Sequence, residues 1–269
     1  MTMSPDSGLK TAGFCYHDVT DDPRTSGLQR DAATPFKLSP ARFAAHLDRI
    51  GGGLATPALV TGIELHRPGR HLFLTFDDGG KSAIQIGDEL CLRGWRGHFF
   101  ISTGLIGRRT FLDAAEIRHL HRSGHVIGSH SHTHPNIYRE LDWERMLVEW
   151  RQSADTLCQI TGEPCLTGSV PGGEISDAVL RSADRAGLRY LFTSEPLLRP
   201  KVVGGCWVLG RYCVKASTSL DTVGELACFQ GWVGKNVVRQ LKAVARRSVP
   251  PLYRFYVGLA RREWQEPVQ

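Results

Sequence analysis

An apolar run that ends in two carboxylates and two glycines constrains this chain more than any other feature. The run is residues 72–80, LFLTFDDGG, with Asp77 and Asp78 as the carboxylates. It predicts a buried strand followed by a sharp exit turn. Adjacent carboxylates at a strand end repel each other and lose hydration, and a nearby cation would remove most of that cost. Taken alone, residues 77–79 are better explained by a plain turn capped by aspartate.

A second segment, residues 128–135, GSHSHTHP, carries three of the eleven histidines of the chain. Together with the carboxylates it indicates a metal site with aspartate and histidine ligands and a spare carboxylate that acts as a base. The spacing leaves the choice of ligands open. On a strand all three histidines would face one side, whereas on a helical turn only His130 and His134 would.

Strand and helix patterns alternate along the chain with short connections, which predicts parallel β units. The predicted strands are 12–19, 71–76, 97–102, 125–129, 166–170, 189–193 and 207–214. The predicted helices are 40–50, 82–93, 113–123, 141–160 and 176–186. About seven parallel strands suit an α/β fold, either a barrel or a strongly twisted open sheet. We expect a barrel domain over residues 1–230 and a basic helical extension over 231–269.

Composition narrows the class of protein. Apolar residues make up 41% of the chain and charged residues 22%, as in an ordinary globular protein. The seven cysteines are odd in number and form no C-x-x-C pair, which argues against a disulfide framework or a cysteine zinc cluster. No signal peptide or transmembrane stretch is recognisable, so we expect a cytoplasmic protein.

The polar residues of interest follow several predicted strands. His17 ends the first strand, Asp77 and Asp78 end the second, and the segments 130–134 and 171–173 follow two others. Function gathers at the carboxyl ends of strands in α/β folds. We therefore expect one site at this end of the barrel.

At these residues the sequence resembles a known family. The segments 75–79, TFDDG, and 130–134, HSHTH, are similar to the first two motifs of the polysaccharide deacetylases, the NodB-homology fold of carbohydrate esterase family 4. The segments 16–19, YHDV, and 97–101, GHFFI, and the helix at 43–47 support the resemblance, which covers roughly residues 13–214. It implies a distorted (β/α) barrel and metal-dependent hydrolysis of the amide of N-acetyl sugars.

The resemblance also implies roles for single residues. Asp78, His130 and His134 would be the metal ligands, and Asp77 the general base. Three protein ligands leave positions open for water and the acetyl oxygen. The expected cofactor is a divalent metal, with zinc preferred and cobalt, manganese, nickel or iron as alternatives.

Three positions depart from the family pattern. Ser169 stands where the family has an arginine that pairs with the base, and Glu195 where it has an aspartate. Arg211 stands where the family has the histidine that acts as general acid. The loop of Pro171 and Gly172 is retained, and a backbone N–H near Gly172 could stabilise an oxyanion.

His17 is our candidate for the missing general acid. Circularly permuted members of the family carry their acid histidine in a similar N-terminal Tyr-His segment, and the alternative is a structural histidine at a strand end. Arg211 is a weaker candidate to replace the missing arginine beside the base or to contact the substrate.

Residues 235–262 carry eight lysines and arginines and no acidic residue. They predict basic helices that either pack on the barrel with solvated charges or lie on an anionic membrane surface. No recognition motif supports binding of nucleic acid.

The functional hypothesis is a metal-dependent N-deacetylase that acts on an N-acetylated sugar or glycan during assembly of a cell-surface glycan. Two alternatives remain open. The changes at Ser169, Glu195 and Arg211 would suit a degenerate relative that binds carbohydrate without turnover, and the same barrel could hydrolyse another amide.

Overall fold

A curled, mostly parallel sheet forms the centre of the molecule in a computed structural model that describes residues 8–173 and 175–248. The strand order is β11-β1-β4-β5-β6-β7-β8-β10-β9, and only β9 runs antiparallel to its neighbour. The strands are β1 (Leu9–Tyr16), β4 (Gly69–Phe76), β5 (His98–Ile101), β6 (Val126–Ser129), β7 (Thr167–Ser169), β8 (Tyr190–Phe192), β9 (Lys201–Val203), β10 (Cys206–Leu209) and β11 (Arg211–Cys213). A small parallel pair, β2 (Asp18–Val19) and β3 (Lys37–Leu38), lies apart.

One run of chain joins the two ends of the curled sheet. β10 pairs with β8, whereas β11, which begins two residues after β10 ends, pairs with β1. Only Gly210 separates the two strands, and a Cβ at Gly210 would lie 2.4 Å from the carbonyl oxygen of Leu197. A glycine is therefore needed where the last strand passes from one partner to the other.

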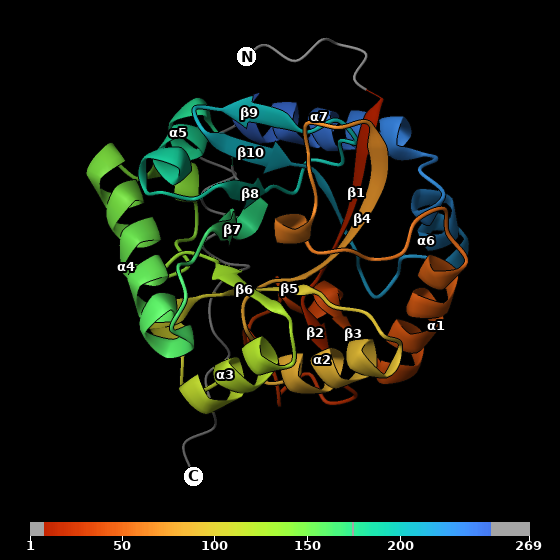
Figure 1. Ribbon diagram of the computed structural model, residues 1–269, viewed down its shortest axis with the longest axis horizontal. Helices are drawn as coiled ribbons and strands as arrows, with labels where there is room; N and C mark the ends of the chain where they lie inside the picture. The colour runs from red at the N-terminus through yellow and green to blue at the C-terminus, as the bar shows by residue number, and fades with distance from the viewer. Residues whose placement is uncertain (1–7, 174, 249–269) are drawn as a thin grey trace.

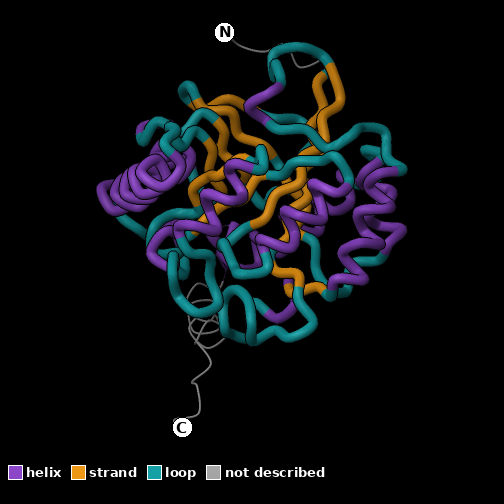
Figure 2. The backbone as a smooth tube through the Cα atoms, turned by 60° about the horizontal axis from the view of Figure 1, so that its bottom comes forward, coloured by secondary structure: helices purple, strands orange, loops and turns teal. Residues whose placement is uncertain are grey.

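Helices surround the outside of the sheet (Figure 1). They are α1 (Pro40–Gly51), α2 (Ala83–Leu92), α3 (Ala114–Arg122), α4 (Trp143–Thr161), α5 (Asp177–Arg185), α6 (Leu220–Ala227) and α7 (Trp232–Ser248). Side-chain caps start five of them and satisfy free backbone N–H groups; the capping residues are Ser39, Asp113, Asp142, Ser176 and Ser219. The tube view in Figure 2 shows the same helices packed around the strands.

The interior of the curled sheet is filled by aromatic side chains. Phe73, Phe100 and Phe192 are fully buried, and the ring of Phe192 lies 5.7 Å from that of Phe73 and 5.4 Å from that of Phe100. Successive residues on a strand alternate between the two faces of a sheet. Thr75 and Asp77, two and four residues after Phe73, therefore share its inward direction.

The fold is the distorted (β/α) barrel that the sequence predicts, with corrections at its ends. All seven expected strands are present, but 207–214 is split at Gly210 and 12–19 is interrupted at His17. β9 and α6 were not predicted. β9 has only three residues, and all of them are exposed or half-buried, so it lacks the apolar run that marks the other strands.

α7 begins at Trp232, close to the expected start of the basic extension. The Trp232 indole donates to the carbonyl oxygen of Leu226, and its ring lies 6.3 Å from that of Phe14. Side chains are described up to residue 240, and residues 249–269 lie outside the described part. The domain division at residue 230 stays a prediction. Among residues 8–173 and 175–248, no helix has both the length and the hydrophobicity that crossing a bilayer demands.

We predict that stability falls as the pH drops from about 6.5 towards 4, because of the buried His98. Val60 N–H donates to His98 Nε2 and His98 Nδ1 donates to the carbonyl oxygen of Leu74, which requires a neutral ring. Burial lowers the pKa of His98 to about 4. The unfolded chain therefore binds a proton first as the pH falls, at a cost of roughly 2–3 kcal/mol.

Urea denaturation between pH 7 and 4 measures this slope. His98→Gln should flatten it, whereas His66→Gln, at an exposed histidine, should leave it unchanged. An NMR titration of the folded protein provides a second readout. A normal pKa for His98 in that titration would contradict the prediction.

Candidate functional site

The predicted site residues meet in one cavity at the carboxyl ends of the strands. Its volume is about 770 Å³. The predicted residues that line it are His17, Asp77, Asp78, His130, His134, Gly172 and Arg211. Pro171 is buried beside the cavity but does not line it. Residues up to 194 positions apart in the sequence thus lie together, as expected for residues that follow the carboxyl ends of neighbouring strands.

Asp78, His130 and His134 present three donor atoms to a common point. His130 Nε2 and His134 Nε2 each lie 3.3 Å from Asp78 Oδ1, and one ligand atom of each residue lies within 4.8 Å of the others. The side chains are at most 6% exposed. One carboxylate and two imidazoles are a donor set that suits a divalent transition metal, so these three residues fit the expected ion.

The backbone orients the His130 imidazole, and side chains fix the backbone of the loop that carries both histidines. His130 Nδ1 lies 3.0 Å from the carbonyl oxygen of Ser169, an arrangement that leaves Nε2 for a metal. The Ser131 hydroxyl accepts from His134 N–H. Glu149 on α4 accepts from His132 N–H, Thr133 N–H and the Thr133 hydroxyl at 2.8, 2.8 and 2.6 Å. The long helix therefore clamps the loop that carries both histidines.

Strained backbone marks the same segments. Four non-glycine residues in the described part of the chain have positive φ, and three of them are Asp78 (78°), Ser131 (64°) and His134 (54°). This left-handed conformation costs free energy for residues with a Cβ and tends to cluster at functional sites. Two of the three candidate ligands thus adopt it.

Charge and burial set the protonation of the ligands. Burial raises the pKa of Asp78, but the hydrogen bonds and charges of His130 and His134 outweigh it and hold that pKa well below its usual range. Burial lowers the pKa of His134, whereas at His130 the nearby carboxylates of Asp77 and Asp78 outweigh burial and raise the pKa. An ionised carboxylate and a neutral imidazole are the forms that bind metal.

Asp77, next to Asp78, is held by Arg211 instead. Arg211 Nη1 lies 2.7 Å from Asp77 Oδ1 and Nη2 lies 2.9 Å from Oδ2, a bidentate pair. Ser169 joins it, because its hydroxyl donates to Asp77 Oδ2 at 3.0 Å and accepts from Arg211 Nη2 at 2.6 Å. Ser169 and Arg211 together surround the carboxylate that a single arginine accompanies in the family pattern.

Arg211 is fully buried with every N–H group used. Besides Asp77 and Ser169, it donates to the Thr75 hydroxyl at 2.8 Å and to the Thr193 carbonyl oxygen at 3.1 Å. Its guanidinium lies 5.6 and 5.8 Å from the ring centres of Phe100 and Phe192. A Cβ at Gly13, its neighbour on β1, would lie 2.7 Å from Arg211 Cγ, so the buried arginine requires glycine there.

The arginine controls the charge of Asp77. Burial raises the pKa of this carboxyl, but the guanidinium of Arg211, with smaller effects from His130 and His17, holds it far below its usual range. Asp77 is therefore an anion at neutral pH although it is only 5% exposed.

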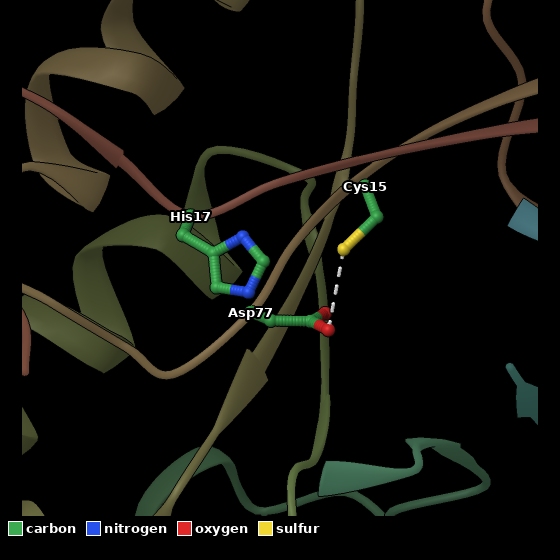
Figure 3. A group of neighbouring side chains, drawn as sticks. All are labelled: Cys15, His17 and Asp77. Atoms are coloured by element: carbon green, nitrogen blue, oxygen red, sulfur yellow. Dashed lines mark hydrogen bonds between the residues drawn. The ribbon is translucent and has the colours of Figure 1, made fainter. Parts of the chain in front are cut away.

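His17 lies beside Asp77, as Figure 3 shows. The Cys15 thiol lies 3.4 Å from Asp77 Oδ2, and burial keeps the pKa of Cys15 well above its usual value. Cys15, His17 and Asp77 form a second group with ligand atoms within 4.8 Å. Both oxygens of Asp77 already bind the cationic Arg211, so this group suits a metal ion less well than that of Asp78.

The remaining histidine of the segment turns away. His132 Nδ1 lies 2.9 Å from the Thr103 hydroxyl, and His132 belongs to neither ligand group. Sequence reasoning missed Cys15 and Glu149. Cys15 lies two residues before His17 on the same face of its strand, a signal that was available; Glu149 looks like any glutamate of an amphipathic helix.

Comparison with known proteins agrees with this geometry. Residues 65–191 match the family described as polysaccharide deacetylase. The match covers slightly less than half of the chain and shows that this region is similar to that family. The matched region includes Asp77, Asp78, His130 and His134, whereas Arg211 lies outside it. This similarity supports deacetylation of a carbohydrate by hydrolysis. A corresponding comparison with curated proteins found no match.

Solved structures share the fold of the deacetylase domain. IcaB from Ammonifex degensii has a TM-score of 0.68 at 20% identity, over 82% of this chain and 98% of that one. The polysaccharide deacetylase BC0361 from Bacillus cereus has a TM-score of 0.66 at 19% identity, and the alignment covers 81% of this chain and 69% of that one. The deacetylase PplD from Streptococcus pyogenes, solved with acetate, has a TM-score of 0.65 at 18% identity, and the alignment covers 81% of this chain and 98% of that one.

We predict that Arg211→Met destabilises the protein by roughly 3–5 kcal/mol, because it leaves the buried Asp77 charge without its partner. Adding Asp77→Asn should recover more than half of that loss. Urea denaturation of the single and double variants measures the coupling. Arg67→Met, which breaks an exposed pair with Glu64, should cost no more than about 1 kcal/mol. Additive effects of the Asp77 and Arg211 substitutions would contradict a strong pair.

Proposed function

We propose that this protein is a metal-dependent hydrolase that removes the N-acetyl group from an amino sugar of a glycan or glycan precursor. The observation that carries the proposal is that two adjacent carboxylates have different partners. Asp78 joins His130 and His134 around one point, while Arg211 holds Asp77 beside them. This arrangement supports a metal site at Asp78 and a separate base, Asp77, in one cavity.

In the proposed reaction, the chain's own residues position the reactants and move protons. A divalent ion held by Asp78, His130 and His134 would lower the pKa of a water molecule and polarise the acetyl carbonyl. Asp77 takes a proton from the attacking water. Because Arg211 makes Asp77 a weak base that is always ionised at neutral pH, the water must already be acidified for this transfer.

The later half of the reaction needs an acid and an anion-stabilising group. His17 borders the cavity beside Asp77 and would protonate the departing amine. The N–H near Gly172, in the loop η5 (Pro171–Gly173), would donate to the oxyanion. Both roles follow the family resemblance and stay predictions.

The degenerate carbohydrate binder is the less favoured alternative. It rests on the changes at Ser169, Glu195 and Arg211. Ser169 and Arg211 together contact Asp77 on both carboxylate oxygens, which supports a working base. Zinc is the proposed ion, because two imidazoles and a carboxylate suit it.

We predict that Asp78→Ala and His134→Ala abolish metal binding. Metal analysis of the purified protein should find about one divalent ion per chain, and near zero in either variant. His132→Ala is the matched control, since this histidine of the same segment bonds Thr103 and should leave the metal content unchanged. Acetate release from nucleotide-linked, lipid-linked and oligomeric N-acetylhexosamines then tests the activity. Metal without acetate from any substrate would favour the binder or another amide; absence of metal would contradict the proposal.

We further predict that His17→Ala keeps the metal but lowers kcat by about 10²–10⁴, because the leaving amine loses its proton donor. Stopped assays of acetate release measure turnover, and metal analysis of the same sample checks the site. His66→Ala, at an exposed histidine, is the control. Equal turnover by His17→Ala and the parent protein would exclude His17 from the mechanism.

A further inference from the structure

The cavity extends beyond the residues that the proposed hydrolysis uses. A volume of about 770 Å³ lies in the range that encloses a whole small-molecule ligand rather than an acetyl group alone. Its remaining lining includes the cationic side chains of Arg30, Lys215 and Lys235. Lys215 and Lys235 therefore add positive charge to the wall of the cavity.

Each of the two lysines contacts an aromatic ring that lies next to a residue of the proposed reaction centre. Lys215 Nζ lies 5.5 Å from the ring centre of Phe36, and that ring lies 4.8 Å from the ring of His17. Lys235 Nζ lies 5.8 Å from the ring centre of Tyr212, the residue after Arg211. A sugar whose acetamido group reaches Asp77 would therefore have its other substituents near these two ammonium groups.

Neither of these two lysines forms an ion pair within the described part of the protein. Arg239, one helical turn after Lys235, forms an ion pair with Glu195 at 3.2 Å, and Arg211 pairs with Asp77. Among residues 8–173 and 175–240, no carboxylate lies within 4.0 Å of Lys215 Nζ or Lys235 Nζ. Two cations that face one cavity attract an anionic ligand.

Helix α7 holds Lys235 at the cavity. Trp232, three residues before it, is buried and bonds the Leu226 carbonyl oxygen. Arg239, four residues after it, donates to the Gly173 carbonyl oxygen at 2.8 Å as well as to Glu195. Lys235 thus lies between two anchors, and its position in the first turn of the helix adds the positive end of the helix dipole.

We propose that this cavity binds its amino sugar through an attached phosphate or diphosphate, which Lys215 and Lys235 hold while the acetamido group faces Asp77 and His17. The inference rests on the proposed deacetylation and names its substrate class: an N-acetylated sugar phosphate or glycosyl diphosphate, rather than a neutral polymer. The phosphate could belong to a soluble nucleotide sugar or to a lipid-linked sugar, because both present the same anion.

The double variant Lys215→Gln/Lys235→Gln tests the proposal in two assays. Calorimetric titration with pyrophosphate measures the anion subsite without any turnover. Acetate release from N-acetylglucosamine 1-phosphate, divided by that from the neutral methyl glycoside, measures its use in the reaction. Lys201→Gln on β9 is the matched control, since Lys201 is exposed and does not line the cavity.

We expect the double variant to weaken pyrophosphate binding at least about tenfold and to lower the ratio of kcat/KM values by a similar factor. Lys201→Gln should change neither. Uridine diphosphate N-acetylglucosamine and a polyprenyl diphosphate N-acetylglucosamine, compared in the same assay, identify the source of the phosphate.

Two results would overturn the phosphate subsite. One is the absence of pyrophosphate binding to the parent protein. The other is equal pyrophosphate affinity of the parent and the double variant. Efficient turnover of the neutral glycoside with no preference for the phosphate would reject this substrate class but leave the deacetylase proposal standing. Failure of every substrate would count against deacetylation alone, because the titration decides the subsite independently.

Discussion

The buried pair of Asp77 and Arg211 is the interaction on which the rest of the site depends. A carboxylate in the middle of a barrel would otherwise be neutralised by protonation, because burial disfavours its charge. The guanidinium donates its five N–H groups to acceptors on β4 and β7 and in the turns after β4 and β8. The same residue therefore ties the strands together and keeps a base ionised beside the ligand group of Asp78.

The pair also explains how the chain tolerates its departures from the family pattern. The position of the usual arginine is occupied by Ser169, whose hydroxyl still contacts Asp77. The guanidinium comes instead from the last strand, where the family has its acid histidine. The serine is small and lies in contact with that side chain, since its hydroxyl accepts from Arg211 Nη2 at 2.6 Å. The chain that lacks the usual acid histidine has another histidine, His17, beside Asp77.

The sequence was sufficient to predict the strands and the meeting of Asp77, Asp78, His130 and His134, because apolar runs mark strands and parallel strands bring their carboxyl ends together. It did not predict the partnership of Ser169 with Arg211, since these residues lie 42 positions apart and no periodic pattern links them. The clamp from Glu149 was missed for the same reason. The short exposed strand β9 was missed because its position depends on pairing with β10 rather than on its own pattern.

The last strand of the sheet, β11, carries Arg211, and this late position in the sequence has a consequence for biosynthesis. Arg211 follows Asp77 by 134 residues, which a ribosome adds in roughly ten seconds. Until then the nascent chain carries two adjacent carboxylates with no guanidinium to compensate them, so they must stay hydrated outside any collapsed core. The reactive centre is consequently among the last parts to form, and a fragment that stops before β11 would hold the histidine loop yet lack a competent base.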